Sequence, residues 1–156
     1  MQHREDLISD ISSEIEKIEE LFKSYTSLLL KSKKKNPNFI ELNALAMFLH
    51  SFYNGLENIF TLIAKKFDER MPSSERWHIE LLEQMAKVTE KREKIVITDK
   101  TCEDLKEYLG FRHFTRHAYA LDINWELMKD LILNINKMKE NIITELKLFI
   151  ESLKKI

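Results

Sequence analysis

Two arginines, two histidines and a tyrosine lie within eight residues of the chain. They are Arg112, His113, Arg116, His117 and Tyr119. An arginine carries a permanent positive charge on a planar fork that matches phosphate oxygens, and a histidine takes up or releases a proton near neutral pH. Together they hold what RNA cleavage without a metal needs, which is an acid or base for the 2′-hydroxyl and the leaving oxygen, and positive charge at the phosphate.

The spacing of these residues limits how their side chains can meet. On a continuous helix Arg112, Arg116 and Tyr119 share about one face, whereas His117 lies about 140° round the axis from Arg112. The two would converge on one phosphate within a single chain only if the helix ended or bent nearby, and residues 119–122 are a suitable end. The alternative is a twofold axis that brings the matching residues of a second chain across the cleft.

Each of these residues also has an interpretation without chemistry. His113 and His117 have an i, i+4 spacing that can hold a metal, but no Glu lies between them and no third ligand is obvious, so we expect no metal site. Arg112 and Arg116 could form a solvated or salt-bridged helix face, as surface arginines usually do. Tyr119 could simply anchor a helix end.

The pattern Arg112-x4-His117-x-Tyr119 resembles the R-x4-H-x-Y form of the signature of HEPN-domain ribonucleases, which is the form found in HepT toxins. Residues 111–119 are similar to one branch of that family that reads F-R-H-x-x-R-H-x-Y. Residues 53–57 and 77–85 resemble the same branch, so the resemblance covers about 53–124.

The resemblance implies a metal-independent endoribonuclease toxin that acts as a dimer. Arg112 would bind and polarise the scissile phosphate and His117 would serve as general base or acid, leaving a 2′,3′-cyclic phosphate and a 5′-hydroxyl. Arg116 and His113 would support them. Many relatives have Asn where this chain has His113, so His113 either joins the chemistry or only orients its neighbours.

The resemblance also implies a protein partner. HepT-like toxins are usually paired with an MntA-like nucleotidyltransferase antitoxin, which transfers AMP from ATP onto the tyrosine of the motif, here Tyr119. A nucleotide fixed there adds bulk and negative charge where the RNA phosphate must bind. The toxin itself needs no cofactor, because only the partner uses ATP.

Other polar residues have two interpretations each. His50, Asn54 and Glu57 share a stripe of an apolar helix, where they could line the cleft and orient the Arg/His pair or form a polar seam at the bundle surface. The lysines of residues 31–35 could steer RNA or be a solvated loop. We expect His78 to pack against the neighbouring Trp77.

The composition predicts an all-α protein. Only two Gly and two Pro occur among 156 residues, so the turn signals that sheets and barrels need are missing. A net charge of −1 means that nucleic acid would have to bind a local patch. Cys102 is the only cysteine, the first residues do not form a signal peptide, and no apolar run approaches the roughly 20 residues of a membrane helix. These features favour a cytoplasmic protein that does not enter a membrane.

Hydrophobic periodicity predicts an antiparallel bundle of four to five helices. We expect residues 1–156 to form a single domain, which the resemblance implies is HEPN/HepT-like. The predicted helices are one along residues 7–29 that stops within 31–36, one over about 38–67, one opened by residues 72–74, one capped by Thr101, and one from about Asn124 to the end. The second helix is apolar on two sides, which predicts a central position and burial against a second chain, hence a homodimer.

A second hypothesis also fits the sequence. The chain could be a non-catalytic helical HEPN module that binds nucleotide or docks a nucleotidyltransferase, since a bundle with a broad apolar face suits docking equally well.

Overall fold

The chain folds as a bundle of antiparallel helices in a computed structural model that describes residues 2–155. Within that range there are six α-helices and one short 3-10 helix, and Thr89 and Arg92 form an isolated β-bridge. The elements are α1 (Gln2–Lys34), α2 (Phe39–Lys66), α3 (Trp77–Met85), α4 (Asp99–His117), η1 (Ala120–Asp122), α5 (Trp125–Leu133) and α6 (Ile135–Lys154). The predicted all-α class is confirmed.

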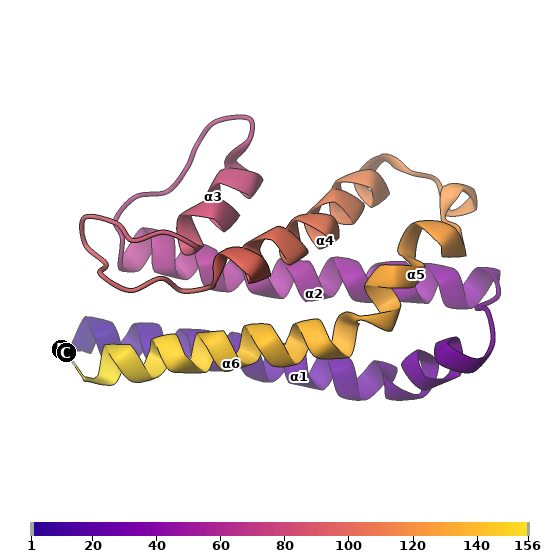
Figure 1. The fold of residues 1–156 in the computed structure, drawn as a ribbon, viewed down its shortest axis with the longest axis horizontal. Coiled ribbons are helices and arrows are strands. Elements are labelled where there is room, and N and C mark those ends of the chain that lie inside the picture. The colour runs from indigo at the N-terminus through magenta and orange to yellow at the C-terminus, as the bar shows by residue number, and fades with distance from the viewer. Residues whose placement is uncertain (1, 156) are drawn as a thin grey trace.

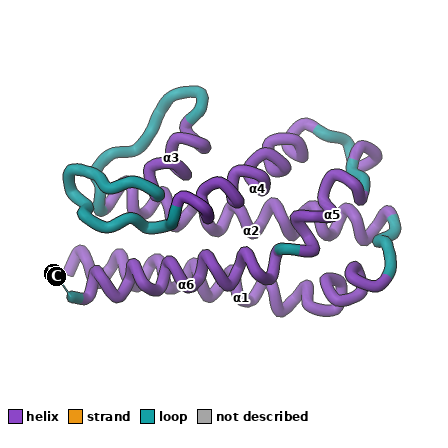
Figure 2. The backbone as a smooth tube through the Cα atoms, in the orientation of Figure 1, coloured by secondary structure: helices purple, strands orange, loops and turns teal. Residues whose placement is uncertain are grey.

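Four rods form the bundle: α1, α2, α4 and the pair α5–α6 (Figure 1). Successive rods run in opposite directions, and α3 packs on α2 and α4. The two long loops, residues 68–76 and 86–98, lie at one end of the bundle, and α4 ends toward the opposite end (Figure 2). No helix in residues 2–155 is both long and apolar enough to cross a membrane.

The first connection forms much as the sequence predicts. Asn38 caps α2, accepting from the Glu41 backbone N–H at 2.9 Å, while the Glu41 carboxylate accepts from the Asn38 N–H at 3.0 Å. The lysine run, interpreted as a loop, is instead mostly the last turn of α1, where cations favour the helix dipole. Lys31 pairs with Glu41 at 2.7 Å, which joins the two helices.

Three boundaries differ from the prediction. Ser74 makes a turn before α3, accepting from the Arg76 N–H, so the helix begins only at Trp77. Thr98 caps α4 in place of Thr101, which instead donates its own N–H to the Thr98 hydroxyl. The last helix is two helices, because at Asn134 the side-chain amide donates to the Asp130 carbonyl and the backbone leaves helical geometry.

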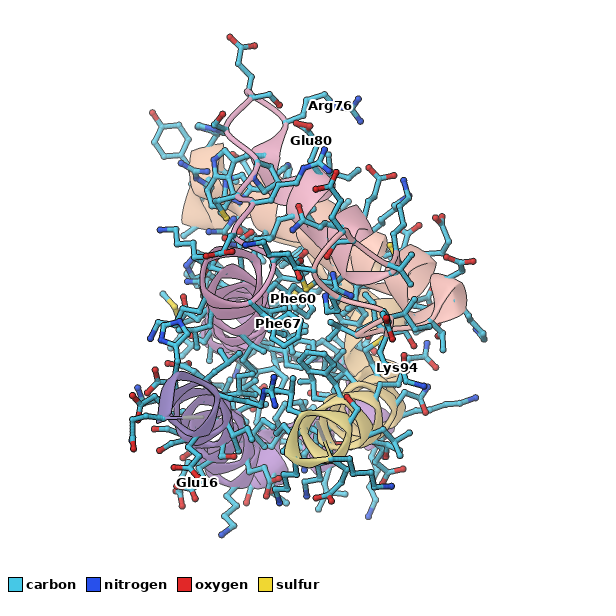
Figure 3. All side chains as sticks on the ribbon, turned by 90° about the vertical axis from the view of Figure 1, so that its left-hand side faces the viewer. Glu16, Phe60, Phe67, Arg76, Glu80 and Lys94 are labelled. Carbon is cyan, nitrogen blue, oxygen red and sulfur yellow. The ribbon has the colours of Figure 1, made fainter. Side chains whose placement is uncertain are left out.

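One continuous core fills the space between the rods. Phe22 of α1 meets Phe48 and Phe52 of α2 edge to face, and Phe52 meets Tyr108 of α4 in the same way. Figure 3 looks along the bundle and shows Phe60 and Phe67 pointing into this core, with Glu16 and Lys94 at the outside. The breadth of the apolar face of α2 is thus explained largely by its central position, although Met47 remains 58% exposed.

Gly55 lies where α1 packs tightly against α2. A Cβ atom at this position would lie 2.9 Å from Cγ1 of Ile18, closer than real side chains pack. The glycine therefore lets the two longest helices cross in contact, directly beside Asn54.

The loop of residues 86–98 is held by a buried arginine. Arg92 is 1% exposed and forms a two-point ion pair with Asp68, at 2.8 and 2.9 Å. Its remaining N–H groups donate to the backbone carbonyls of residues 84, 87 and 94. The short apolar run of residues 95–97 lies in this loop, with Val96 and Ile97 buried.

Candidate functional site

Helix α4 carries the motif and is continuous from Asp99 to His117. It ends at Ala118, whose backbone is extended, so the chain leaves the helix where residues 119–122 predicted an end. No bend separates Arg112 from His117. The offset of five positions therefore places the two side chains on different faces of α4.

Arg112 points toward α2 and is largely buried, with 11% of its side chain exposed. Its Nε donates to Oδ1 of Asn54 at 2.9 Å, and Nη2 lies 3.7 Å from a carboxylate oxygen of Glu57. The Asn54 amide in turn donates to Nε2 of His50 at 3.0 Å. The structure thus brings all three polar residues of the α2 stripe into one cluster with Arg112.

His78 of α3 completes this cluster, a position that the sequence interpretation missed. Its Nδ1 donates to the second carboxylate oxygen of Glu57 at 2.7 Å. The expected contact with Trp77 is present, with ring centroids 3.6 Å apart, but it is not the only one. Glu57 therefore links Arg112 to His78 through its two carboxylate oxygens. The sequence did contain a signal for His78, because residues 77–85 resemble the family.

One nitrogen of Arg112 has no partner. Nη1 is buried without a hydrogen bond, although a guanidinium has five N–H donors and buried donors are almost always satisfied. An unpaired buried donor is costly. The guanidinium of Arg112 is consequently held through Nε and Nη2, while Nη1 lacks a hydrogen-bond partner.

The rest of the motif faces outward. His113, Arg116 and His117 are exposed, and Tyr119 is 80% exposed. The ring of His113 meets that of His78 edge to face, with ring centroids 5.4 Å apart, and this contact connects His113 to the cluster. The backbone N–H of Tyr119 donates to the Asp122 carboxylate at 3.0 Å, so η1 fixes the main chain beneath the tyrosine ring.

Two histidines close to Arg112 have a lowered pKa. Burial lowers the pKa of His50, and the charges of Arg112 and Arg116 lower it further. The pKa of His113 is also lowered, first because part of this otherwise exposed ring is shielded from water, and then by His78 and the same two arginines. Neutral imidazoles at pH 7 can accept a proton, which is the state that a general base requires.

A metal site is not evident around the motif. Across residues 2–155 no three His, Cys, Asp or Glu side chains converge in a way that could hold a metal ion. Cys102 is buried, and burial raises the pKa of its thiol. The histidines His113 and His117 stand one turn apart on an exposed face of α4.

The fold is an all-α bundle. In its site, Asn54 and Glu57 hold Arg112 on one side, and Glu57 also bonds to His78. Together with the exposed His117-x-Tyr119, these features define a class of helical protein. The chain belongs to the HepT-like protein family, whose model matches residues 44–153. This confirms the resemblance on which the motif was interpreted, and the match extends beyond it to include α5 and almost all of α6. No curated protein and no solved structure matches the chain.

Proposed function

We propose that the protein is a metal-independent endoribonuclease toxin that acts as a homodimer. Arg112 binds and polarises the scissile phosphate, and His117 takes the proton of the attacking 2′-hydroxyl or protonates the departing 5′-oxygen. The 2′-oxygen bonds to phosphorus as the 5′-oxygen leaves, which gives a 2′,3′-cyclic phosphate and a 5′-hydroxyl. Arg116 and His113 support the pair.

The observation that carries this proposal is the state of Arg112. Its charge is aligned by Asn54 and Glu57, yet Nη1 lacks a partner. A phosphate oxygen would satisfy that donor and strengthen the interaction as negative charge builds up in the transition state. Because Nη1 is buried, the phosphate reaches it only after a neighbouring side chain moves, so substrate binding and exposure of Nη1 are coupled.

A second chain is needed to complete the site. Helix α4 runs straight through Arg112 and His117, so the two side chains of one chain point to different faces. A twofold axis near the end of α4 would set Arg112 of one chain opposite His117 of the other. Exposed apolar side chains at this end favour such a contact: Phe114 is 40% and Leu121 85% exposed.

Tyr119 is suited to regulation. Its side chain is exposed while its backbone is fixed by Asp122, so a modifying enzyme meets an accessible hydroxyl at a defined position. We propose that an MntA-like nucleotidyltransferase antitoxin transfers AMP to this hydroxyl, with pyrophosphate as the leaving group. The added phosphate brings negative charge two residues from His117 and repels the RNA backbone.

The test is induced expression of wild-type protein, Arg112→Ala and His117→Ala, with Arg70→Ala and His3→Ala as controls at exposed positions. Growth should stop with the wild type and both controls, and continue with the two motif variants. The purified wild-type protein should cleave cellular RNA in EDTA and leave cyclic phosphate ends. Arrest by either motif variant at the wild-type rate would contradict the assignment.

Regulation is tested by intact-mass measurement after co-expression with the nucleotidyltransferase. AMP-sized additions should be present on the wild-type chain and absent from Tyr119→Phe. If the purified chain never cleaves RNA but forms a stable unmodified complex with the transferase, the non-catalytic docking module is the better description.

A further inference from the structure

A hollow of about 310 Å³ lies between α3 and α4, and it is lined in part by His78, the residue that bonds to Glu57. The residues that line it include Arg76, His78, Lys106, Leu109, Gly110 and His113. This volume is at the lower end of the range for small-molecule sites, enough for one flat ring system. The hollow adjoins the Arg112 cluster, because His78 belongs to both.

Gly110 in this hollow has no explanation inside the fold. Glycine in the middle of a helix weakens it, and α4 needs no unusual backbone here, since Gly110 does not have a positive φ. A Cβ at Gly110 would meet no atom within 4 Å, whereas a Cβ at Gly55 would collide with Ile18. The space left by Gly110 thus opens into the hollow and makes room for something outside the chain.

The walls of the hollow suit a base and its phosphates. His78 and His113 meet edge to face at 5.4 Å, and His78 lies against Trp77, so flat rings line one side. Nucleic-acid bases stack on such rings, histidine included. Lys106 adds a positive charge, although it is shared with Glu103 and Glu83, and the acidic Glu75 also lines the hollow. Arg76 points away from the core into solvent (Figure 3), where phosphates would pass.

We propose that the hollow between α3 and α4 binds an unpaired base of single-stranded RNA, next to the phosphate held by Arg112. This rests on the proposed nuclease function and names its substrate class. A base inside a duplex is stacked and paired and cannot enter a recess of this size, so the site selects unpaired RNA.

The experiment fills the hollow without unfolding the protein. Gly110→Leu places a side chain into open space on a helix and should not lower the thermal midpoint. Thr144→Leu, which adds a similar side chain at an exposed, neutral position of α6, is the matched control. The probe is a short fluorescent single-stranded RNA with 2′-O-methyl riboses, which cannot be cleaved, and binding is read by anisotropy.

Gly110→Leu should weaken binding of this probe about tenfold or more, as loss of one stacked base would, and Thr144→Leu should leave it unchanged. In a further series of probes, a single abasic nucleotide is placed at each position of the strand in turn. With the wild-type protein, the abasic nucleotide should weaken binding by the same factor at one of these positions. That loss should vanish with Gly110→Leu, since the hollow is already closed. The duplex form of the probe should bind weakly to both proteins.

The proposal is overturned if Gly110→Leu binds the single strand as tightly as the wild type does. It is also overturned if the abasic loss is equal in the two proteins, or if the duplex binds best. Because the probe is uncleavable, these results do not depend on nuclease activity. Cleavage of an unmodified strand by the wild type, measured separately, decides the proposed function.

Discussion

Two buried arginines of this protein are held in opposite ways. Arg92 and Arg112 both pair with a carboxylate supplied by α2 or by the loop that follows it, and both are at most about a tenth exposed. Arg92 directs five hydrogen bonds to Asp68 and three carbonyls, so its fork is saturated. Arg112 makes one hydrogen bond and one longer ion pair, and Nη1 has no partner.

The difference separates a structural arginine from one available for binding. A saturated guanidinium has no donor left for a ligand, and its removal strands a buried carboxylate. A guanidinium that is anchored on one edge keeps its direction while a donor remains for another molecule. The count of satisfied donors, more than burial or the presence of an acidic partner, distinguishes the two sites.

The largest expected effect on stability is that of Arg92→Ala. It leaves Asp68 buried without a counter-charge and removes a side-chain donor from three backbone carbonyls, so the unfolding free energy should fall by about 3–5 kcal/mol. Urea unfolding measures the loss, and Lys91→Ala, at the exposed neighbouring position, should stay within about 0.5 kcal/mol of wild type. A loss for Arg92→Ala below about 1 kcal/mol would show that its network is not structural.

For Arg112→Lys we expect the opposite balance, with a large loss of activity and a small loss of stability. The charge remains but the fork is lost, so RNA cleavage should fall about 100-fold or more. Stability should fall by only about 1–2 kcal/mol, less than for Arg92→Ala, because fewer bonds are lost. Initial cleavage rates and urea unfolding on the same preparation give both numbers. Cleavage near the wild-type rate would mean that Arg112 acts only as a point charge.

Glu57→Gln tests the link between Arg112 and His78. The amide keeps the size of the side chain and one acceptor oxygen but removes the charge that aligns both partners. We expect cleavage to fall about tenfold through misplacement of Arg112. The folded state should persist in a thermal melt, and Glu80→Gln on α3 is a control. An unchanged cleavage rate and pH profile would reduce Glu57 to a packing role.

The smallest effect concerns pH. The pKa values of His50 and His113 are lower in the folded chain than their ordinary value of 6.5, so between pH 7 and 5 the unfolded chain binds more protons. Stability contributed by these groups is therefore present above pH 6.5 and lost as the pH falls below it. Urea unfolding at pH 7.5 and 5.5 should show this loss, and a double His50→Gln, His113→Gln variant should show less of it. An equal loss in both proteins would place the sensitivity elsewhere.

The sequence predicted the fold class because every core helix carries an apolar stripe of period near 3.6. It missed the break at Asn134 because the stripe continues across it, from Leu131 through Ile135 to Met138. Local capping decided the other boundaries. Thr98 and Thr101 are both threonines and could each cap α4, and only the backbone geometry selects Thr98.

The site was predictable in part for the same reason. The motif on α4 is local in sequence and was recognised, whereas the bond from Arg112 to Asn54 spans 58 positions and depends on how α2 and α4 pack. Arg92 was hidden in a run of charged residues, which ordinarily lies at the surface. His78 was assigned to its neighbour Trp77, and its bond to Glu57 depends on where α3 docks.

Gly55 gives α2 a fixed rotational setting. Because Ile18 fills the space where a side chain would stand, α2 cannot turn about its axis without separating from α1. Asn54, directly before Gly55, and Glu57, two positions after it, are the residues that orient Arg112. A methyl group added at Gly55 would thus shift α2 against α1 and, through Asn54 and Glu57, change the orientation of the Arg112 guanidinium without altering any residue of the motif.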